Sequence, residues 1–169
     1  MIAAVLCNGP SKKLYDESKE YDFRIGCNIP WTRVDATVIL DEEITRYWSK
    51  HRDVITCPVY FSEDACRFAS EIQFRPWLVE HEYLLGLVKR GRFRSSGNIA
   101  CECVIELGYK QIDIYGADAY YTQKPGYNNE SFTRKFLPPP DVNNSHRWKK
   151  VWDDMIKKHP DVKFNFIKE

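Results

Sequence analysis

One short segment combines the residue types that bind anions. Residues 94–98 read RSSGN and precede a stretch with the apolar spacing of a helix. Ser95 or Ser96 can cap that helix, and Gly97 lets a ligand approach its first free N–H groups. The helix dipole and two nearby arginines add positive potential. The segment predicts an anion site, or else a well-capped helix with nothing bound.

Polar residues also follow several predicted strands, at Asn8, Asn28, Asp41 and Asp118. Asparagine offers a donor and an acceptor together, which suits base edges and sugar hydroxyls. The alternative is turn chemistry, since Asn tolerates left-handed backbone. For one Asn the turn is the commoner explanation, but two at successive strand ends shift the balance moderately towards a ligand.

A third group of candidates lies towards the C-terminus. Residues 120–144 are polar, aromatic and proline-rich, without a recognisable helix or strand, as in a lid or binding loop. Tyr120 and Tyr127 could donate to phosphate, although a single loop Tyr more often anchors the loop. His146 begins the last predicted helix and could act as general base or acid. The alternative for His146 is a capping or surface role.

The elements that would position these residues alternate along the chain. Near-continuous apolar runs predict strands covered on both faces. These runs are Ile2–Leu6, Phe23–Cys27, Ala36–Leu40, Val54–Cys57, Gln111–Tyr115 and Val162–Ile167. Helical spacing lies between them, over residues 41–51, 75–91, 95–110 and 145–161. The alternation predicts one α/β domain, with an open, mostly parallel, Rossmann-like sheet and helices on both faces. Ligands then bind at the carboxyl ends of the strands.

Composition bounds the remaining choices. The 169 residues carry a net charge of +1, so no overall field attracts nucleic acid or membrane. The six cysteines form no Cys-x-x-Cys pair and no zinc-spaced cluster, and no apolar run is long enough to span a membrane. A cytoplasmic protein without a metal is expected. The aromatic content of 14% leaves room for an interface between copies of the chain.

The order of these motifs resembles that of the bacterial family 42 sialyltransferases and related short Rossmann-like proteins. The resemblance rests on the NGPS turn at residues 8–11, on Cys27-Asn28 closing the second strand, on residues 95–120, and on NNSHRW before the last helix. It implies a metal-independent glycosyltransferase that uses a nucleotide sugar, with CMP as the suspected nucleotide. The acceptor stays open between a glycan, a small molecule and a nucleic acid.

The resemblance also implies roles for the candidate residues. Asn8 and Gly9 would approach the phosphate and ribose, Asn28 would hydrogen-bond the donor, and two tyrosines would donate to the departing phosphate. The serines and glycine of the RSSGN segment would hold the donor's anionic group. The expected binding residues are Asn8, Gly9, Ser11, Asn28, Asp41, Ser95, Ser96, Gly97, Asn98 and Asp118. The expected catalytic residues are Tyr120, Tyr127 and His146.

Three departures from the family pattern open alternatives. Lys149 stands where the family has its catalytic His, so His146 takes that role or the base is missing. Asp41 replaces an Asn and would repel the carboxylate of a sialic acid. The chain is short, and residues 120–144 are its only candidate lid. The missing His and the short lid favour, as an alternative, a nucleotide-binding protein without catalysis. A further alternative is a Mg²⁺-dependent pyrophosphokinase-like enzyme, because related short proteins of this fold transfer diphosphate; Asp41 and Asp118 could hold the Mg²⁺.

Overall fold

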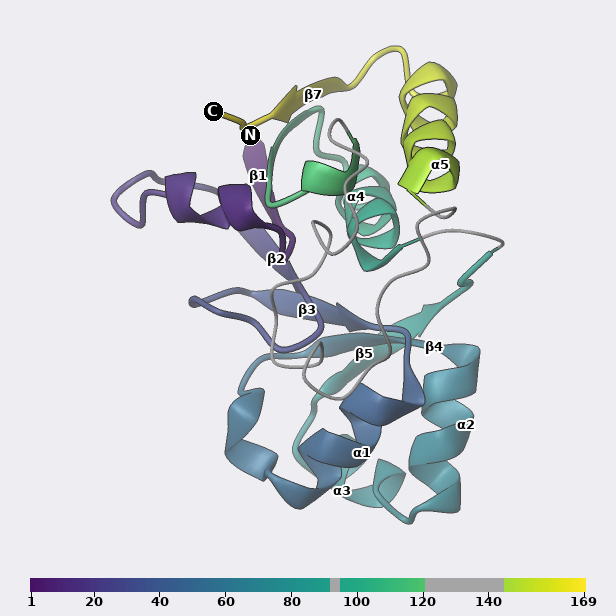
Figure 1. Cartoon of the computed structure of the whole chain (residues 1–169). Helices are drawn as coiled ribbons and strands as arrows, with labels where there is room; N and C mark the ends of the chain where they lie inside the picture. The colour runs from purple at the N-terminus through teal and green to yellow at the C-terminus, as the bar shows by residue number, and fades with distance from the viewer. Residues whose placement is uncertain (92–94, 121–144) are drawn as a thin grey trace.

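In the part of the chain that the structure describes, seven parallel strands form a single open sheet in the order β5-β4-β3-β2-β1-β6-β7. The computed structural model of the chain describes residues 1–91, 95–120 and 145–169 (Figure 1). The strands are β1 (Ile2–Leu6), β2 (Phe23–Cys27), β3 (Ala36–Ile39), β4 (Val59–Ser62), β5 (Leu84–Val88), β6 (Gln111–Tyr115) and β7 (Lys163–Phe166). The expectation of an open, parallel, Rossmann-like α/β fold is confirmed.

Helices connect the strands. The α-helices are α1 (Glu42–Lys50), α2 (Glu63–Glu71), α3 (Arg75–Glu80), α4 (Ser96–Glu106) and α5 (Ser145–Lys158). The described residues also include the short 3₁₀ helices η1 (Pro10–Leu14), η2 (Arg52–Val54) and η3 (Asp118–Tyr120). Acidic residues begin α1, Ser95 caps α4, and Pro160 follows α5, all as helix-end chemistry requires.

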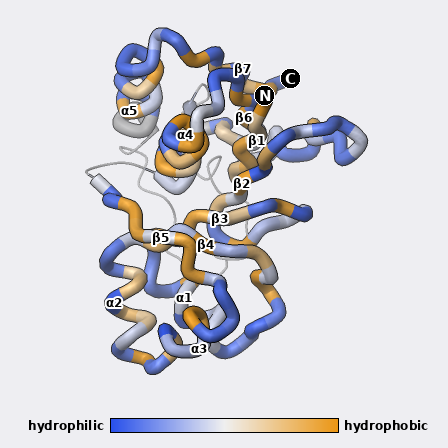
Figure 2. Tube along the Cα trace, turned by 180° about the vertical axis from the view of Figure 1, so that it is seen from behind, coloured by the Kyte–Doolittle hydropathy of each residue, from blue (hydrophilic) through white to orange (hydrophobic). Residues whose placement is uncertain are grey.

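The two faces of the sheet are covered by different helices. On one face α4 packs across β1, β2 and β3, and α5 lies beside it through Trp152 and Met155. On the other face α1, α2 and α3 cover β3, β4 and β5 with Ile44, Trp48 and Phe74 in the core. Figure 1 shows the two helix groups on opposite sides of the sheet. In Figure 2, α4 is hydrophobic over most of its length, because α5 and the sheet both bury it.

Among the described residues, no α-helix packs on the face of β1 and β6 opposite α4. A small aromatic cluster covers it, with Tyr21 and Tyr115 buried and Tyr15 and Trp31 packed against them. Tyr15 and Tyr21 come from the segment between η1 and β2, Trp31 from the β2–β3 connection, and Tyr115 from the end of β6. This face therefore depends on connecting segments for its cover.

Two of the element boundaries expected from sequence are wrong. Residues 75–91 were expected as one helix, but α3 ends at Glu80 and β5 begins at Leu84. Glu82 between them has φ of 58°, and Tyr83 N–H donates to Leu78 O, so the chain turns there. The strand expected at Val54–Cys57 instead starts at Val59, after Pro58. Apolar runs alone do not fix where a short strand enters a sheet.

The order of the strands determines where a ligand site would lie. β1 lies between β2 and β6, with Leu6 level with both Gly26 and Tyr115. The chain builds outward from β1 to β5 and then returns to place β6 on the other side of β1. The connections therefore diverge at the carboxyl ends of β1 and β6, where doubly wound sheets bind ligands.

Candidate functional site

The turn after β1 is tied to the turn after β6 by a set of hydrogen bonds. Gly9 N–H donates to Gly116 O at 2.8 Å, and Gly116 N–H donates to Ser11 Oγ at 3.1 Å. Ser11 in turn donates to Asp118 Oδ2 from its backbone N at 2.9 Å and from its hydroxyl at 3.0 Å. Both side chains are buried. Ser11 and Asp118, expected as binding residues, thus hold the two turns together.

Gly116 is required for this junction, and the sequence reading missed it. Its φ is 70°, and a Cβ there would lie 2.4 Å from the carbonyl oxygen of Cys7. Only glycine allows that approach. The signal was present as the glycine directly after a predicted strand, in the sequence YGAD.

Asn8 bridges the ends of β1 and β2. Its Nδ2 donates to Cys27 O at 3.0 Å, and the residue is only 4% exposed. That bond fixes which end of the amide is nitrogen. Its Oδ1 is buried and accepts no hydrogen bond from any described residue.

Asn28 follows directly, at the end of β2. Its backbone has φ of 60°, its N–H donates to Val38 O at 2.9 Å, and its carbonyl accepts from Thr37 Oγ1 at 2.8 Å. The left-handed backbone agrees with turn chemistry, the alternative to ligand binding for this residue. The side chain has a further feature: its Oδ1 is buried without a hydrogen-bond partner among the described residues.

Asn98 lies in the first turn of α4 and is fully buried. Its Oδ1 accepts from Ser95 N at 3.0 Å and from Ser95 Oγ at 2.8 Å, which satisfies the start of the helix. Its Nδ2 is buried with no hydrogen-bond partner in the described part of the chain. Ser95 is the helix N-cap, and Ser96 is the first helical residue.

Gly97 brings the start of α4 against the turn after β1. A Cβ at Gly97 would lie 2.7 Å from Cys7 Sγ and 3.1 Å from the Trp152 ring. The missing side chain therefore allows close packing of helix on strand, which is one established use of glycine at such sites. Gly97 was expected to admit a ligand; the structure gives it this packing role.

Asn8, Asn28 and Asn98 form what we call the amide cluster. Asn8 donates a hydrogen bond to Cys27, which precedes Asn28, and Cys7 packs against Gly97, which precedes Asn98. A buried polar group without a partner costs about 1–3 kcal/mol, so such groups are rare in folded proteins. Two acceptors and one donor are left open on three neighbouring elements at the carboxyl edge of the sheet.

Beside the amide cluster, the buried residues Cys7, Cys27 and Cys101 contribute to the apolar core. Cys27 Sγ lies 4.0 Å from Cys7 Sγ, and Cys101 of α4 packs in the same core cluster. The hydrogen bond to Cys7 and burial raise the pKa of the Cys27 thiol, and burial raises the pKa of Cys101. These thiols stay protonated and act as small apolar side chains rather than nucleophiles.

Asp41 is the N-cap residue of α1 and pairs with Arg90, which follows β5. The Arg90 Nη1 to Asp41 Oδ1 distance is 2.8 Å, and both side chains are about half exposed. The arginine offsets the negative charge that would repel an acidic sugar. Asp41 therefore gives no reason, by charge alone, to exclude such a donor.

Tyr120 packs on α5 and β7. Its ring stacks on Phe166 at 4.4 Å, and its hydroxyl donates to Asp153 Oδ1 at 2.8 Å. Burial and this bond raise the pKa of Tyr120 to about 12. Lys149 Nζ donates to Asp153 Oδ2 at 2.9 Å and lies 5.2 Å from the centre of the Tyr120 ring. The expected phosphate donor therefore has a carboxylate as its hydrogen-bond acceptor.

The other catalytic candidates are only partly placed. Tyr127 lies outside the described residues. The backbone of His146 belongs to the first turn of α5, while its side chain is outside the described part. Because α5 leads from the carboxyl end of β6 back to β7, this turn lies on the carboxyl side of the sheet. His146 thus shares that side with the amide cluster.

Two absences hold for the described residues. Within residues 1–91, 95–120 and 145–169, no three His, Cys, Asp or Glu side chains converge as metal ligands. In the same ranges, no helix has the length and apolar character needed to cross a membrane. Asp41 and Asp118, the candidate magnesium ligands, are bonded to Arg90 and Ser11 respectively.

Comparisons of the chain with protein-family models, with curated proteins and with solved structures found no match.

Proposed function

We propose that the amide cluster binds a nucleotide-derived ligand, and that the protein is a nucleotide-sugar-dependent glycosyltransferase. The observation that carries the binding step is the set of three buried amide atoms without partners, Asn8 Oδ1, Asn28 Oδ1 and Asn98 Nδ2. They lie where parallel sheets bind nucleotides, beside the divergence of β1 and β6.

The polarity of the open groups suits such a ligand. Two open acceptors match the hydroxyls of a ribose or the amino group of a base, and the open donor matches a phosphate or carbonyl oxygen. The N-terminus of α4 adds its dipole, which favours a negative phosphate. The Gly9 N–H, bonded to Gly116 O, supplies none of these contacts.

The transfer step rests on the family resemblance and on the position of His146 at the start of α5. His146 would take the proton of an acceptor hydroxyl as its oxygen attacks the anomeric carbon of the donor. The bond between that carbon and the phosphate oxygen would break, and the electron pair would leave with the nucleotide. The acceptor would thereby gain the sugar, and a nucleoside phosphate would be released.

A second function is favoured by one specific contact. Tyr120, a residue expected to donate to the leaving phosphate, donates instead to Asp153. Lys149, at the position of the family's catalytic His, is held by the same carboxylate. These pairings favour a protein that binds the nucleotide derivative without transferring the sugar.

Binding is tested by thermal unfolding with CMP, UMP, AMP, GMP and the corresponding nucleotide sugars. A ligand specific for the folded state, at ~100 times its dissociation constant, adds about 2.7 kcal/mol to the free energy of unfolding. We expect Asn8→Ala to weaken binding at least about tenfold, or 1.4 kcal/mol. Asn165→Ala, which removes an amide from β7, is the matched control and keeps the affinity. No stabilisation by any of these compounds would refute the proposal.

Transfer is tested separately by incubating the protein with the nucleotide sugar that binds best and a panel of acceptors. Turnover that is lost in His146→Ala, while nucleotide affinity is kept, supports the transferase. Equal turnover in that variant would exclude His146 as the base. Tight nucleotide binding with no turnover of any nucleotide sugar would support the second function, in which the protein binds the nucleotide derivative without transferring the sugar.

A further inference from the structure

A groove with a volume of about 680 Å³ lies against η1. The residues that line it are Pro10, Lys12, Lys13, Tyr15, Glu17, Trp31 and Thr32. Its size falls within the range of small-molecule sites, which join apolar and aromatic walls with a few polar groups.

The aromatic walls of this groove are fixed by contacts behind them. Trp31 Nε1 donates to Cys7 O at 3.1 Å, which anchors the indole to the turn after β1. Tyr15 packs edge-on against Trp31 at 5.5 Å, and its hydroxyl accepts from Arg24 Nε at 2.9 Å. Aromatic walls that are already ordered lose little conformational entropy when a ligand binds.

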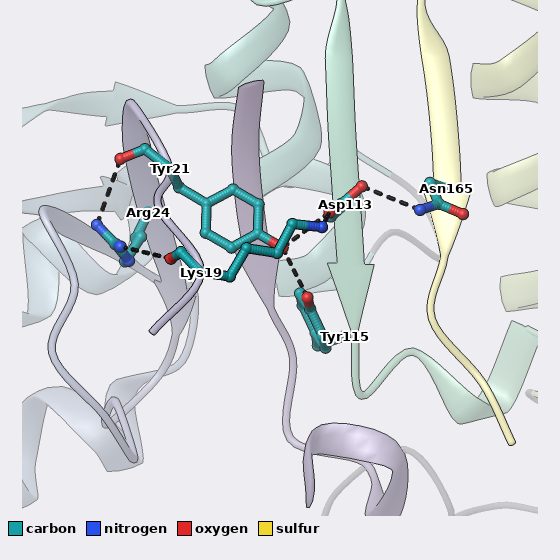
Figure 3. A network of polar contacts seen from close by, with 6 residues as sticks. All are labelled: Lys19, Tyr21, Arg24, Asp113, Tyr115 and Asn165. Atoms are coloured by element: carbon teal, nitrogen blue, oxygen red, sulfur yellow. Dashed lines mark hydrogen bonds and ion pairs between the residues drawn. The ribbon is translucent and has the colours of Figure 1, made fainter. Parts of the chain in front are cut away.

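The support extends into the sheet through a buried network, shown in Figure 3. Tyr21 donates to Asp113 Oδ2 at 2.7 Å, and its hydroxyl lies 2.6 Å from that of Tyr115. Lys19 Nζ lies 2.6 Å from the same Asp113 oxygen. These bonds hold residues 19–21 on β6, and Tyr15 packs against Tyr21 and Tyr115.

The polar groups of the groove are arranged around the aromatic walls. Lys12 and Lys13 lie on η1, and Glu17 accepts from Thr32 Oγ1 at 2.7 Å. Lys13 also pairs with Glu169, with both side chains largely exposed. Such an exposed pair contributes little to stability. The charged residues that line the groove are two lysines and Glu17, which together carry one net positive charge.

We infer that this groove binds an acidic sugar, meaning a sugar ring that carries a phosphate or carboxylate. The apolar face of the ring packs on Trp31, and the lysines bind the anionic group. Glu17 and Thr32 meet the hydroxyls. The aromatic walls Tyr15 and Trp31 belong to the cluster on the sheet face opposite α4, and on this ground we place the acidic sugar apart from the nucleotide. The assignment of the acidic sugar as the transfer acceptor rests on the proposed function. The binding of the acidic sugar to this groove does not.

The test is a titration of ¹⁵N-labelled protein, observed by NMR. The probes are glucose 6-phosphate, glucuronate and N-acetylneuraminate, with glucose and inorganic phosphate as controls. The readouts are the Trp31 indole signal, assigned by comparison with Trp31→Phe, and the backbone amides of η1. We expect saturable shifts with at least one acidic sugar, about tenfold tighter than with glucose or phosphate.

Variants locate the binding. Lys12→Ala should weaken it about tenfold, whereas Lys50→Ala, an exposed lysine at the end of α1, should not. Trp31→Leu should also weaken binding about tenfold, as measured from the shifts of the η1 backbone amides. If Trp31→Leu does not fold, Lys12→Ala decides. The Asn8→Ala variant should bind the acidic sugar normally.

Several outcomes would overturn the inference. They are an absence of saturable shifts with all three acidic sugars, equal binding of glucose or phosphate, and unchanged affinity in Lys12→Ala. Tighter binding of a short oligothymidylate would identify the groove as a nucleic-acid site instead. A parallel titration with CMP, read at the side-chain amides of Asn8 and Asn28, reports on the proposed function independently.

Discussion

Ser11 and Asp118, 107 residues apart in sequence, are joined by two hydrogen bonds to a single carboxylate oxygen. The hydroxyl of Ser11 also accepts from Gly116 N–H at 3.1 Å. One side chain therefore connects the turn after β1 with the turn after β6. The shape of the carboxyl edge between these strands depends on this pair.

Ser11→Ala is expected to destabilise the protein by about 1–3 kcal/mol, because Asp118 and Gly116 N–H then lose a buried partner. Urea unfolding measures the change. Ser18→Ala is the matched control, because the Ser18 hydroxyl makes its 2.7 Å bond to Asp16 on the exposed surface. Equal losses in the two variants would show that the buried junction has no special importance.

Gly97→Ala is expected to destabilise by about 1–3 kcal/mol, since the new methyl group would overlap Cys7 Sγ. Gly86→Ala is the control, where the added Cβ would meet the Tyr60 ring at an ordinary 3.7 Å. Combining Gly97→Ala with Cys7→Ala should recover part of the loss. If the double variant is simply the sum of the two singles, the proposed contact is not the cause.

Asn28→Gly separates the backbone role of Asn28 from its side-chain role. Glycine accepts the φ of 60°, and the bond from Thr37 goes to the backbone carbonyl, so stability should change by less than about 1 kcal/mol. Nucleotide binding should weaken, because the Oδ1 acceptor is gone. Gln73→Gly, at φ of 59° after α2, should leave binding unchanged. Calorimetric titration of both variants decides the matter.

The lowered pKa of Asp113 predicts that the protein loses stability in acid. Burial raises its pKa, but hydrogen bonds from Lys19, Tyr21 and Asn165 outweigh this, so its pKa lies below the ordinary value. A lowered pKa contributes stability above the unfolded pKa of about 3.9, and the contribution disappears as pH falls through the folded value. Unfolding free energies measured from pH 6 to pH 2 should therefore fall less steeply in Asp113→Asn than in the wild type.

The control for that measurement is Asp64→Asn, which changes an exposed carboxylate 3.5 Å from Arg67 on α2. Its acid profile should follow that of the wild type, because exposed pairs contribute little. Identical profiles for Asp113→Asn and the wild type would exclude the buried network of Figure 3 as a source of pH dependence.

Much of the fold was predictable because its signals are local. Strand Ile2–Leu6 is apolar throughout, which is typical of a parallel strand buried on both faces. The serine cap of α4 and the acidic first turn of α1 were also readable, since capping depends on neighbouring residues. The sequence LLGLV was misread as helix because short apolar runs do not distinguish a helix from a strand.

The sequence alone determined the alternation of strands and helices, and with it the placement of Asn8, Asn28, Ser95 and Asp118 at strand or helix ends. Local propensity and hydrophobic pattern act over a few residues, so they can specify this much. Only the tertiary structure decided that β6 lies beside β1. That pairing of distant segments turned Ser11 and Asp118 into a junction, bonded Tyr120 to Asp153, and left the three amides of Asn8, Asn28 and Asn98 with open groups.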